Sequence, residues 1–438
     1  MMDRKLNREI LRLSVPSILA NISVPLVGFV DTAISGHLYG VSAAAAIGAV
    51  SVGSMFLSLL YWNFAFLRAG TGGLTAQAYG AGDDRTAAKM LWRGLGVALG
   101  VALALLVLQL PFLKLATLVT HASAEVTSLA QDYFLIRIWA APATLCLQVF
   151  SGWFVGEQDS MSSMWKDLIV NGVNIAASIV LSKHIGFNGI ALGTVIAQYS
   201  GLLFCIGVAA LKYRRLLACF PLRELKDAFK REEMVPYLKM NGNLFVRSLC
   251  FMVIYLGYTL IAARLSDELL ACSSVMMQLL MLFSYFTDGF AYAGEALTGR
   301  FIGAGDRPMM HRSVRYVFVW SMSIACLFIG LYHLAGVPVL RLLTDDASVV
   351  ATCSRYLWWL LIMPPLGCAA FTWDGIFLGA ACTRPVRDSM IAAMVAFLAV
   401  WFAGELLLGP SMDLLLAAYF AHLASRTIWL SACWKKIA

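Results

Sequence analysis

The sequence predicts an all-α polytopic membrane protein of twelve transmembrane helices. Three observations lead to this fold class: an apolar composition, a series of long charge-free stretches, and an internal repeat. Of the 438 residues, 60% are hydrophobic and only 13% are charged. The mean hydropathy is +0.77. A water-soluble domain has no place for that much apolar surface, whereas a bilayer accepts it.

Each expected helix rests on a run of apolar residues long enough to cross a bilayer, which takes about 20 residues. Two weaker segments, 168–182 and 414–434, complete the twelve. The other ten are charge-free: 13–30, 41–67, 94–113, 138–156, 185–211, 248–263, 269–287, 317–340, 356–373 and 389–404.

The basic residues predict the orientation, because short cytoplasmic loops carry the excess of Lys and Arg. Of the 33 basic residues, 25 lie at the two ends and in the even-numbered loops, and four lie in the odd-numbered loops. Both termini are therefore expected in the cytoplasm. The remaining four are arginines in or beside apolar spans: Arg68, Arg137, Arg247 and Arg355.

The chain repeats itself at an offset of 223 residues. This offset places Gly80-Ala81-Gly82-Asp83 over Gly303-Ala304-Gly305-Asp306 and, without a gap, Pro142 over Pro365 and Gly152 over Gly375. Six spans per half predict two parallel, pseudo-symmetric lobes, residues 1–211 and 240–438. A basic cytoplasmic linker, residues 212–239, joins them. Paired lobes of this kind are typical of transporters that work by alternating access.

Four motifs, in order along the chain, resemble the multidrug and toxic compound extrusion (MATE) family, and within it the DNA-damage-inducible protein F branch. The resemblance implies two lobes forming a V around a central cavity in the bacterial inner membrane. It also implies secondary active export of organic cations or amphipathic toxic compounds in exchange for protons or sodium. The motifs are PLVGFVDTAISGHL (25–38), GLTAQAYGAGD (73–83), DGFAYAGEALTGRFIGAGD (288–306) and WDGIFLGA (373–380).

Asp31 is the clearest candidate for the ion-coupling site. It ends a charge-free run on the first span, and an ionisable group in a span is expensive unless it has a function. Pro25 lies six residues earlier and interrupts the backbone hydrogen bonding. The sequence offers no cationic partner near Asp31, and the alternative is a position at the outer interface. The resemblance matches Asp31 to the essential acid of the N-terminal lobe.

The resemblance also assigns Asn174 and Thr194 to the cation site, and Asn171 lies on the same helix face as Asn174. Many relatives carry a second aspartate where this chain has Ser178. A sodium site needs several hard oxygen ligands and enough negative charge to offset dehydration, so the loss of a carboxylate favours protons as the coupling ion. Sodium stays open as the alternative.

In the C-terminal lobe the candidates are Asp288, Glu295 and Asp374, with Arg247 as the expected partner of one acid. Relatives often show an aspartate where this chain has Asn243, which leaves Arg247 more dependent on Asp374 or Asp288. A purely structural buried ion pair is the competing interpretation.

The sequence lacks the residue patterns that other classes of function require. No metal-binding motif, no phosphate-binding loop and no nucleophile–base set is present, so we expect neither enzyme activity nor a cofactor. The positive charge follows the loops and indicates no nucleic-acid partner. The expected partners are small organic compounds and membrane lipids, and the expected state is a monomer. The alternative is a flippase for lipids or lipid-linked precursors, which would place several Arg or Lys in its cavity.

Overall fold

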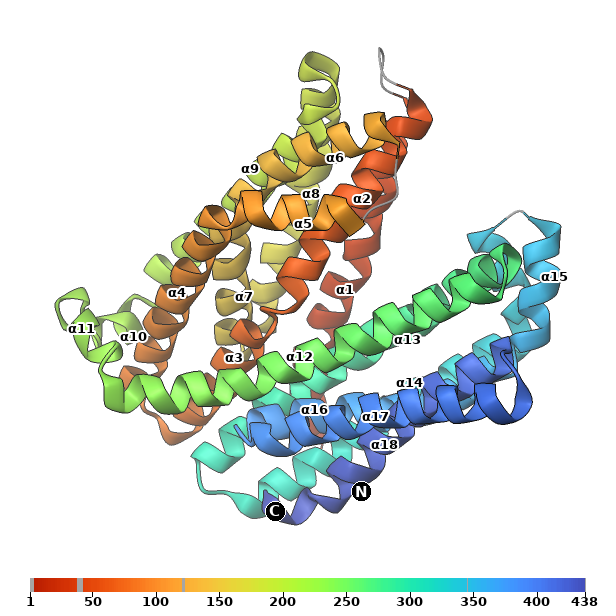
Figure 1. The fold of residues 1–438 in the computed structure, drawn as a ribbon. Coiled ribbons are helices and arrows are strands. Elements are labelled where there is room, and N and C mark those ends of the chain that lie inside the picture. The colour runs from red at the N-terminus through yellow and green to blue at the C-terminus, as the bar shows by residue number, and fades with distance from the viewer. Residues whose placement is uncertain (1–3, 38–41, 120–122, 345, 438) are drawn as a thin grey trace. The chain divides into compact units, whose positions relative to one another are not determined.

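The computed structural model describes residues 4–37, 42–119, 123–344 and 346–437, and these are helical almost throughout (Figure 1). Both terminal residues, Met1 and Ala438, lie outside the described residues. Within the described ranges there is no strand, and eleven helical segments are long and apolar enough to cross a membrane. The all-α polytopic membrane fold is confirmed.

The helices follow one another with short connections. The apolar segments 43–81 and 124–156 each combine two consecutive helices, α2 with α3 and α6 with α7. The helices are α1 (Arg4–Ser35), α2 (Ala43–Trp62), α3 (Phe66–Ala81), α4 (Asp84–Val107), α5 (Gln109–Val119), α6 (Ala124–Arg137), α7 (Ala141–Gly156), α8 (Ser160–Ile185), α9 (Asn188–Lys212), α10 (Arg214–Ala218), α11 (Leu225–Ala228), α12 (Arg231–Leu265), α13 (Asp267–Gly303), α14 (Arg307–Leu343), α15 (Ala347–Tyr356), α16 (Trp359–Gly379), α17 (Thr383–Leu408) and α18 (Met412–Ala432).

The twelfth predicted span corresponds to α18, which is 21 residues long. It does not count among the eleven most apolar segments, because it carries Asp413, His422 and Arg426. Two of these, His422 and Arg426, are only 1% exposed, so they face the protein interior. Polar residues that point inward weaken the hydropathy signal of a helix and leave its outer face apolar.

The structure divides into two compact units. One consists of Leu19–Tyr237, and the other of Met1–Ile18 together with Leu238–Ala438. The first part of α1 therefore belongs to the unit built from the second half of the chain. There Arg300 donates to Glu9 at 3.2 Å, and the Trp320 indole donates to Asn7 at 2.9 Å.

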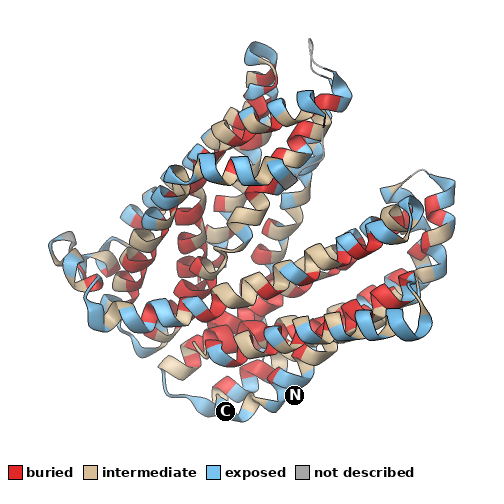
Figure 2. Ribbon diagram, in the orientation of Figure 1, coloured by how far each residue is buried: buried red, intermediate tan, exposed pale blue. Residues whose placement is uncertain are grey.

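Each unit has its own core of large apolar side chains. In Leu19–Tyr237 the core includes Trp153 and Phe154, and in the other unit it includes Phe283 and Phe397, all four fully buried. Figure 2 shows buried residues on the inner faces of the helices of each unit and exposed residues on the outer faces. Many exposed residues are apolar, such as Leu406, which is 86% exposed. An apolar outer surface of this kind suits contact with lipid.

The internal repeat reappears as two matching helix corners. The sequence GAGD ends α3 and again ends α13, and Gly82 and Gly305 both adopt the left-handed backbone, with φ of +67° and +71°. The aspartate that follows caps the next helix: Asp83 accepts from the Thr86 amide at 3.0 Å, and Asp306 from the Met309 amide at 3.0 Å. Glycine adopts this backbone without strain, and Asp is a preferred N-cap. These motifs are therefore turns that redirect the chain.

The repeat also fixes where helices cross. At Gly152 of α7, an added Cβ would lie 2.0 Å from the Arg68 carbonyl oxygen of α3. At Gly375 of α16, it would lie 2.1 Å from the Ala291 carbonyl oxygen of α13. Both glycines and both carbonyls are 223 residues apart in the sequence. Each half thus uses the same backbone contact, which only glycine permits.

The basic segment between the two halves packs against α4. Arg93 of α4 is 3% exposed, and its Nε donates to the Ala228 carbonyl at 2.9 Å. Arg93 and Lys89 both form ion pairs with Glu233. The Phe229 ring occupies the space beside Gly96, where an added Cβ would lie 2.2 Å from it. Although its composition is that of a solvated linker, this segment is ordered against the first half of the chain.

Candidate functional site

The four residues predicted for ion coupling lie together inside the unit Leu19–Tyr237. Asp31 comes from α1, Asn174 and Ser178 from α8, and Thr194 from α9. Their exposed fractions are 5%, 2%, 0% and 4%, so all four are buried. We call this set the Asp31 cluster. The Asp31 side chain is therefore shielded from solvent by the protein itself.

Hydrogen bonds connect the Asp31 cluster. The Asn174 amide donates to Thr194 Oγ1 at 2.9 Å, and Thr194 Oγ1 donates to the Ile190 carbonyl at 3.3 Å. Ser178 Oγ donates to the same carbonyl at 3.5 Å and lies close enough to the Asp31 carboxylate to act on it. A continuous polar path therefore runs from the carboxylate on α1 to the amide on α8.

Two acceptor oxygens in the Asp31 cluster have no hydrogen-bond partner among the described residues. They are Asp31 Oδ1 and Asn174 Oδ1, both inaccessible to solvent. A buried acceptor without a donor costs about 1–3 kcal/mol, so a structure that keeps two of them gains from a ligand that satisfies them. A proton, a metal cation or an ammonium group would do so.

Glycines on α9 let its backbone come close to α8 at this point. A Cβ on Gly193 would lie 2.6 Å from Ser178 Oγ, and one on Gly189 would lie 2.4 Å from the Leu181 carbonyl carbon. Any larger residue at position 193 would displace the Ser178 hydroxyl. The local sequence GIALG thus positions the serine that contacts Asp31.

Asn171, three residues before Asn174, binds a different helix. Its amide donates to Ser23 Oγ of α1 at 2.6 Å, whereas Asn174 binds Thr194 of α9. Two contacts hold α1 against α8 at different points along the helices. One joins Asn171 to Ser23, and the other brings Ser178 close to Asp31. Asn171 therefore stabilises the helix pair and does not contribute to the Asp31 cluster.

The structure corrects one expectation about Asp31, because a cation does act on it. The charge of Arg137 on α6 interacts with the Asp31 carboxylate. Arg137 donates to Tyr133 Oη at 2.5 Å and to Ser54 Oγ at 3.0 Å, which holds the guanidinium in place. The sequence feature that could have indicated this role is Arg137 at the edge of an apolar span, one helical turn after Tyr133.

A second charged cluster lies in the other unit. Asp374 of α16 accepts from Arg247 of α12 at 2.7 Å and from Arg426 of α18 at 2.5 Å, through the same oxygen, Oδ2. Asp374 is 6% exposed and Arg426 is 1% exposed. We call these three residues the Arg–Asp–Arg cluster. By its position in the sequence, Arg426 counts among the C-terminal basic residues, although it lies inside the twelfth predicted span.

Two further predicted acids of that unit lie on one helix. Glu295 is fully buried and Asp288 is half-buried, both on α13, and both have interactions of their own. The ion pair formed by Arg247 is with Asp374. Asn243 donates to Thr383 Oγ1 at 3.1 Å and accepts from Arg387 at 3.0 Å.

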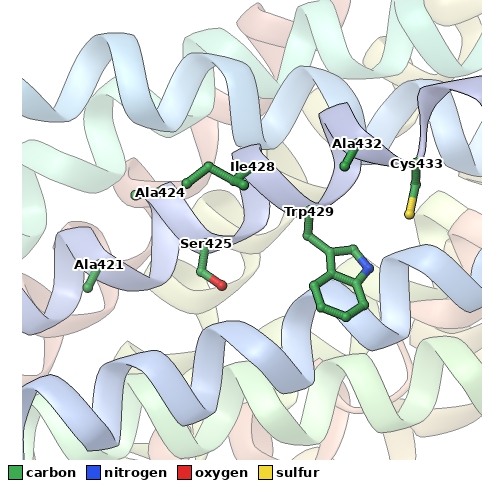
Figure 3. Close-up of a pocket in the computed structure, with 7 residues that line it drawn as sticks. All are labelled: Ala421, Ala424, Ser425, Ile428, Trp429, Ala432 and Cys433. Carbon is green, nitrogen blue, oxygen red and sulfur yellow. The ribbon is translucent and has the colours of Figure 1, made fainter.

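An apolar hollow of about 630 Å³ lies along α18. Figure 3 shows the seven residues that line it, including Ser425 and Trp429. None of the seven carries a charge, and Ile428 is 69% exposed. The hollow therefore provides an apolar surface but none of the chemistry needed to bind an ion.

Glu157 is a buried acid between two spans, just after the end of α7. It is 8% exposed, and its Oε1 has no hydrogen-bond partner in the described part of the chain. Burial, together with the nearby charges of Asp84 and Asp159, raises the pKa of Glu157 to about 8. Burial also acts to raise the pKa of Asp159, but hydrogen bonds from Lys212 and Tyr213, at 2.6 and 2.8 Å, outweigh it and lower that pKa.

Glu157→Gln should therefore flatten the pH dependence of stability. The folded state holds a proton on Glu157 up to about pH 8, whereas an unfolded glutamate releases it near pH 4.3. The free energy of unfolding therefore falls as the pH rises between these two values. Above about pH 8 the loss of stability caused by the buried, ionised Glu157 is complete. Thermal unfolding in detergent should give the variant a higher melting temperature at pH 8.5 and an unchanged one at pH 4. Equal melting temperatures at pH 8.5 would contradict the prediction.

Comparisons with known proteins agree with this architecture. The MatE family model matches residues 16–180 and 244–404, one stretch in each half. The chain is 35% identical to DNA damage-inducible protein F of Escherichia coli (strain K12) over 434 residues, which cover 98% of this chain and 92% of the relative. It is 23% identical over 394 residues to a probable multidrug resistance protein NorM of Photorhabdus laumondii, covering 86% and 83% of the two chains.

The fold also matches solved transporter structures. A crystal structure of MATE in complex with MaL6 superposes with a TM-score of 0.86 at 18% identity, over 99% of this chain and 96% of that one. The family model covers most of the chain, and the E. coli relative aligns over nearly its whole length. The chain therefore belongs to the multidrug and toxic compound extrusion family of membrane transporters.

Proposed function

We propose that this protein exports organic cations or amphipathic compounds in exchange for protons, by alternating access, and that Asp31 carries the proton. The observation that carries the proposal is the Asp31 cluster: one buried carboxylate, two acceptor oxygens without partners among the described residues, and neutral hydrogen-bonding neighbours. The names of relatives such as NorM, a probable multidrug resistance protein, support the class of cargo.

The composition of the Asp31 cluster favours protons over sodium. A metal cation in a buried site needs several oxygen ligands and negative charge to replace its hydration shell. Ser178 supplies a hydroxyl where the family resemblance leads us to expect a second carboxylate, so Asp31 is the one carboxylate of the cluster. A proton needs only one carboxylate oxygen, so this cluster suffices for it.

Proton binding and cargo binding would compete at Asp31. When ionised, Asp31 attracts a cationic cargo, and Asn174 Oδ1 offers a second acceptor. When protonated, the carboxyl group loses its charge and becomes a donor, so a cation is no longer held. Exchange of one for the other on opposite sides of the membrane couples export to the proton gradient.

We further propose that the protein lies in the bacterial inner membrane with both termini in the cytoplasm, and that it works as a monomer. The distribution of Lys and Arg supports this orientation. Lys89 and Arg93, two of the basic residues behind this orientation, pair with Glu233 at the start of α12. The similarity to a protein of Escherichia coli supports the proposal that the membrane is a bacterial one.

Transport assays in proteoliposomes test the coupling ion. The cargo is a permanently charged fluorescent cation, (9-anthracenylmethyl)trimethylammonium, which cannot follow a pH gradient by losing a proton. We expect an imposed proton gradient to drive its transport with no sodium present, and a sodium gradient alone to have no effect. Ser178→Asp, which restores the second carboxylate, should introduce a response to sodium. A strict sodium requirement in the unmodified protein would overturn proton coupling.

A further inference from the structure

The Arg–Asp–Arg cluster carries more positive than negative charge. Arg247 and Arg426 each contribute one positive charge, and both are paired with the single carboxylate of Asp374. Arginine stays protonated in proteins, so neither residue can relieve the imbalance by losing a proton. Within the described residues, the ion pairs of the cluster therefore leave one positive charge without a counter-charge.

Two side chains that contact or sense Arg426 are uncharged or aromatic. The charge of Arg426 acts on His422, one turn earlier on α18, and its guanidinium lies 5.4 Å from the centre of the Phe371 ring. Neither side chain is an anion. Both carboxylate contacts of the two guanidinium groups go to one oxygen, Asp374 Oδ2. A charge buried in this way destabilises the protein unless a partner reaches it.

Donor atoms in the cluster are available for such a partner. The Nε atoms of Arg247 and Arg426 are both buried and have no hydrogen-bond acceptor in the part of the chain that the structure describes. An arginine presents its donors in a planar fork that fits the two oxygens of a carboxylate, sulfonate or phosphate group. Donors without acceptors and excess positive charge are the two features expected of a site for an anionic group.

The two arginines differ in accessibility, which indicates the side from which a ligand enters. The Arg247 side chain is 26% exposed, whereas that of Arg426 is 1% exposed. Arg247 therefore meets the ligand, and Arg426 lies behind it. Phe371 and Tyr255, both half-buried, belong to the apolar surroundings of this unit and provide surface for the hydrocarbon part of a ligand.

We propose that the Arg–Asp–Arg cluster binds the anionic group of an amphipathic compound. This inference rests on the proposed function and narrows its cargo, because it assigns acidic amphiphiles to the second half of the chain and cations to the Asp31 cluster. The competing view is a structural triad in which the second arginine merely strengthens the pair. The two views predict opposite effects of removing the carboxylate.

The test measures ligand binding to purified, full-length protein in detergent. The probe is anthracene-9-sulfonate, an anionic fluorophore, and (9-anthracenylmethyl)trimethylammonium is its matched cation. Arg426→Gln should weaken binding of the sulfonate by about tenfold or more, because a charge-assisted hydrogen bond and one positive charge are lost. Asp374→Asn should strengthen it, because the competing carboxylate becomes neutral.

Opposite shifts by the two variants, with binding of the cation unchanged by Arg426→Gln, would support the proposal. Weaker binding in both variants, or no change in either, would overturn it in favour of the structural triad. Should Arg426→Gln fail to fold, Arg247→Gln provides the same test, because that side chain is partly exposed. Proton-driven transport of the cation is measured separately in proteoliposomes, so its failure would count against the proposed function and not against the anion site.

Discussion

Asp31→Asn should abolish proton-driven export while leaving the protein folded. Asparagine has nearly the same shape and keeps an oxygen beside Ser178. The variant lacks the titratable group, so it resembles the protonated state permanently and cannot exchange a proton for cargo. Export of (9-anthracenylmethyl)trimethylammonium from proteoliposomes, at matched protein content, should fall to the level of protein-free vesicles.

Asp132→Asn is the matched control. Asp132 lies on α6, five residues before Arg137, but it is exposed, so the same change there should leave export at the wild-type level. Normal export by Asp31→Asn would show that the coupling carboxylate lies elsewhere. Asp374 would then be the next candidate.

Gly152→Ala and Gly375→Ala should each destabilise the protein severely. The new methyl group would lie 2.0 Å from the Arg68 carbonyl oxygen in one case and 2.1 Å from that of Ala291 in the other. The neighbour is helix backbone, which cannot rotate away as a side chain would. We expect a loss of about 3 kcal/mol or more, at the upper end of what overpacking costs. Loss of the monodisperse peak in size-exclusion chromatography and a lower melting temperature would reveal it.

Gly172→Ala and Gly330→Ala provide the controls, one in each unit. Both glycines lie within helices, and an added Cβ would meet nothing within 4 Å. Alanine favours the helix by about 1 kcal/mol relative to glycine, so these variants should be as stable as the wild type or more so. If all four variants behaved alike, close backbone contact at Gly152 and Gly375 would not be what determines stability.

Much of this architecture is predictable from the sequence because bilayer physics acts locally. An apolar run of sufficient length must form a helix that satisfies its own hydrogen bonds, so the spans follow from composition alone. The 223-residue offset likewise located the paired corners at Gly82 and Gly305. The twelfth span gave the weakest signal because His422 and Arg426 lower its mean hydropathy. An average over the helix does not show that these two side chains point inward.

Asp31 was predictable from its place in an apolar span, whereas its partners came from the resemblance. Asp31, Asn174, Ser178 and Thr194 come from three helices, and their meeting depends on the packing of α1, α8 and α9. Arg137 was missed as a neighbour of Asp31, because the two residues lie far apart in the sequence and no local pattern connects them. Arg426 was missed for a different reason: a basic residue near the chain end resembles a loop residue.

The division of α1 between the two units has a consequence for biosynthesis. Its first part, through Ile18, belongs with Leu238–Ala438. Its contacts there span 291 residues from Glu9 to Arg300 and 313 residues from Asn7 to Trp320. The ribosome delivers this segment about 300 residues before the partners that it contacts. The first part of α1 thus enters the membrane long before it can find its place, and its packing must wait for α13 and α14.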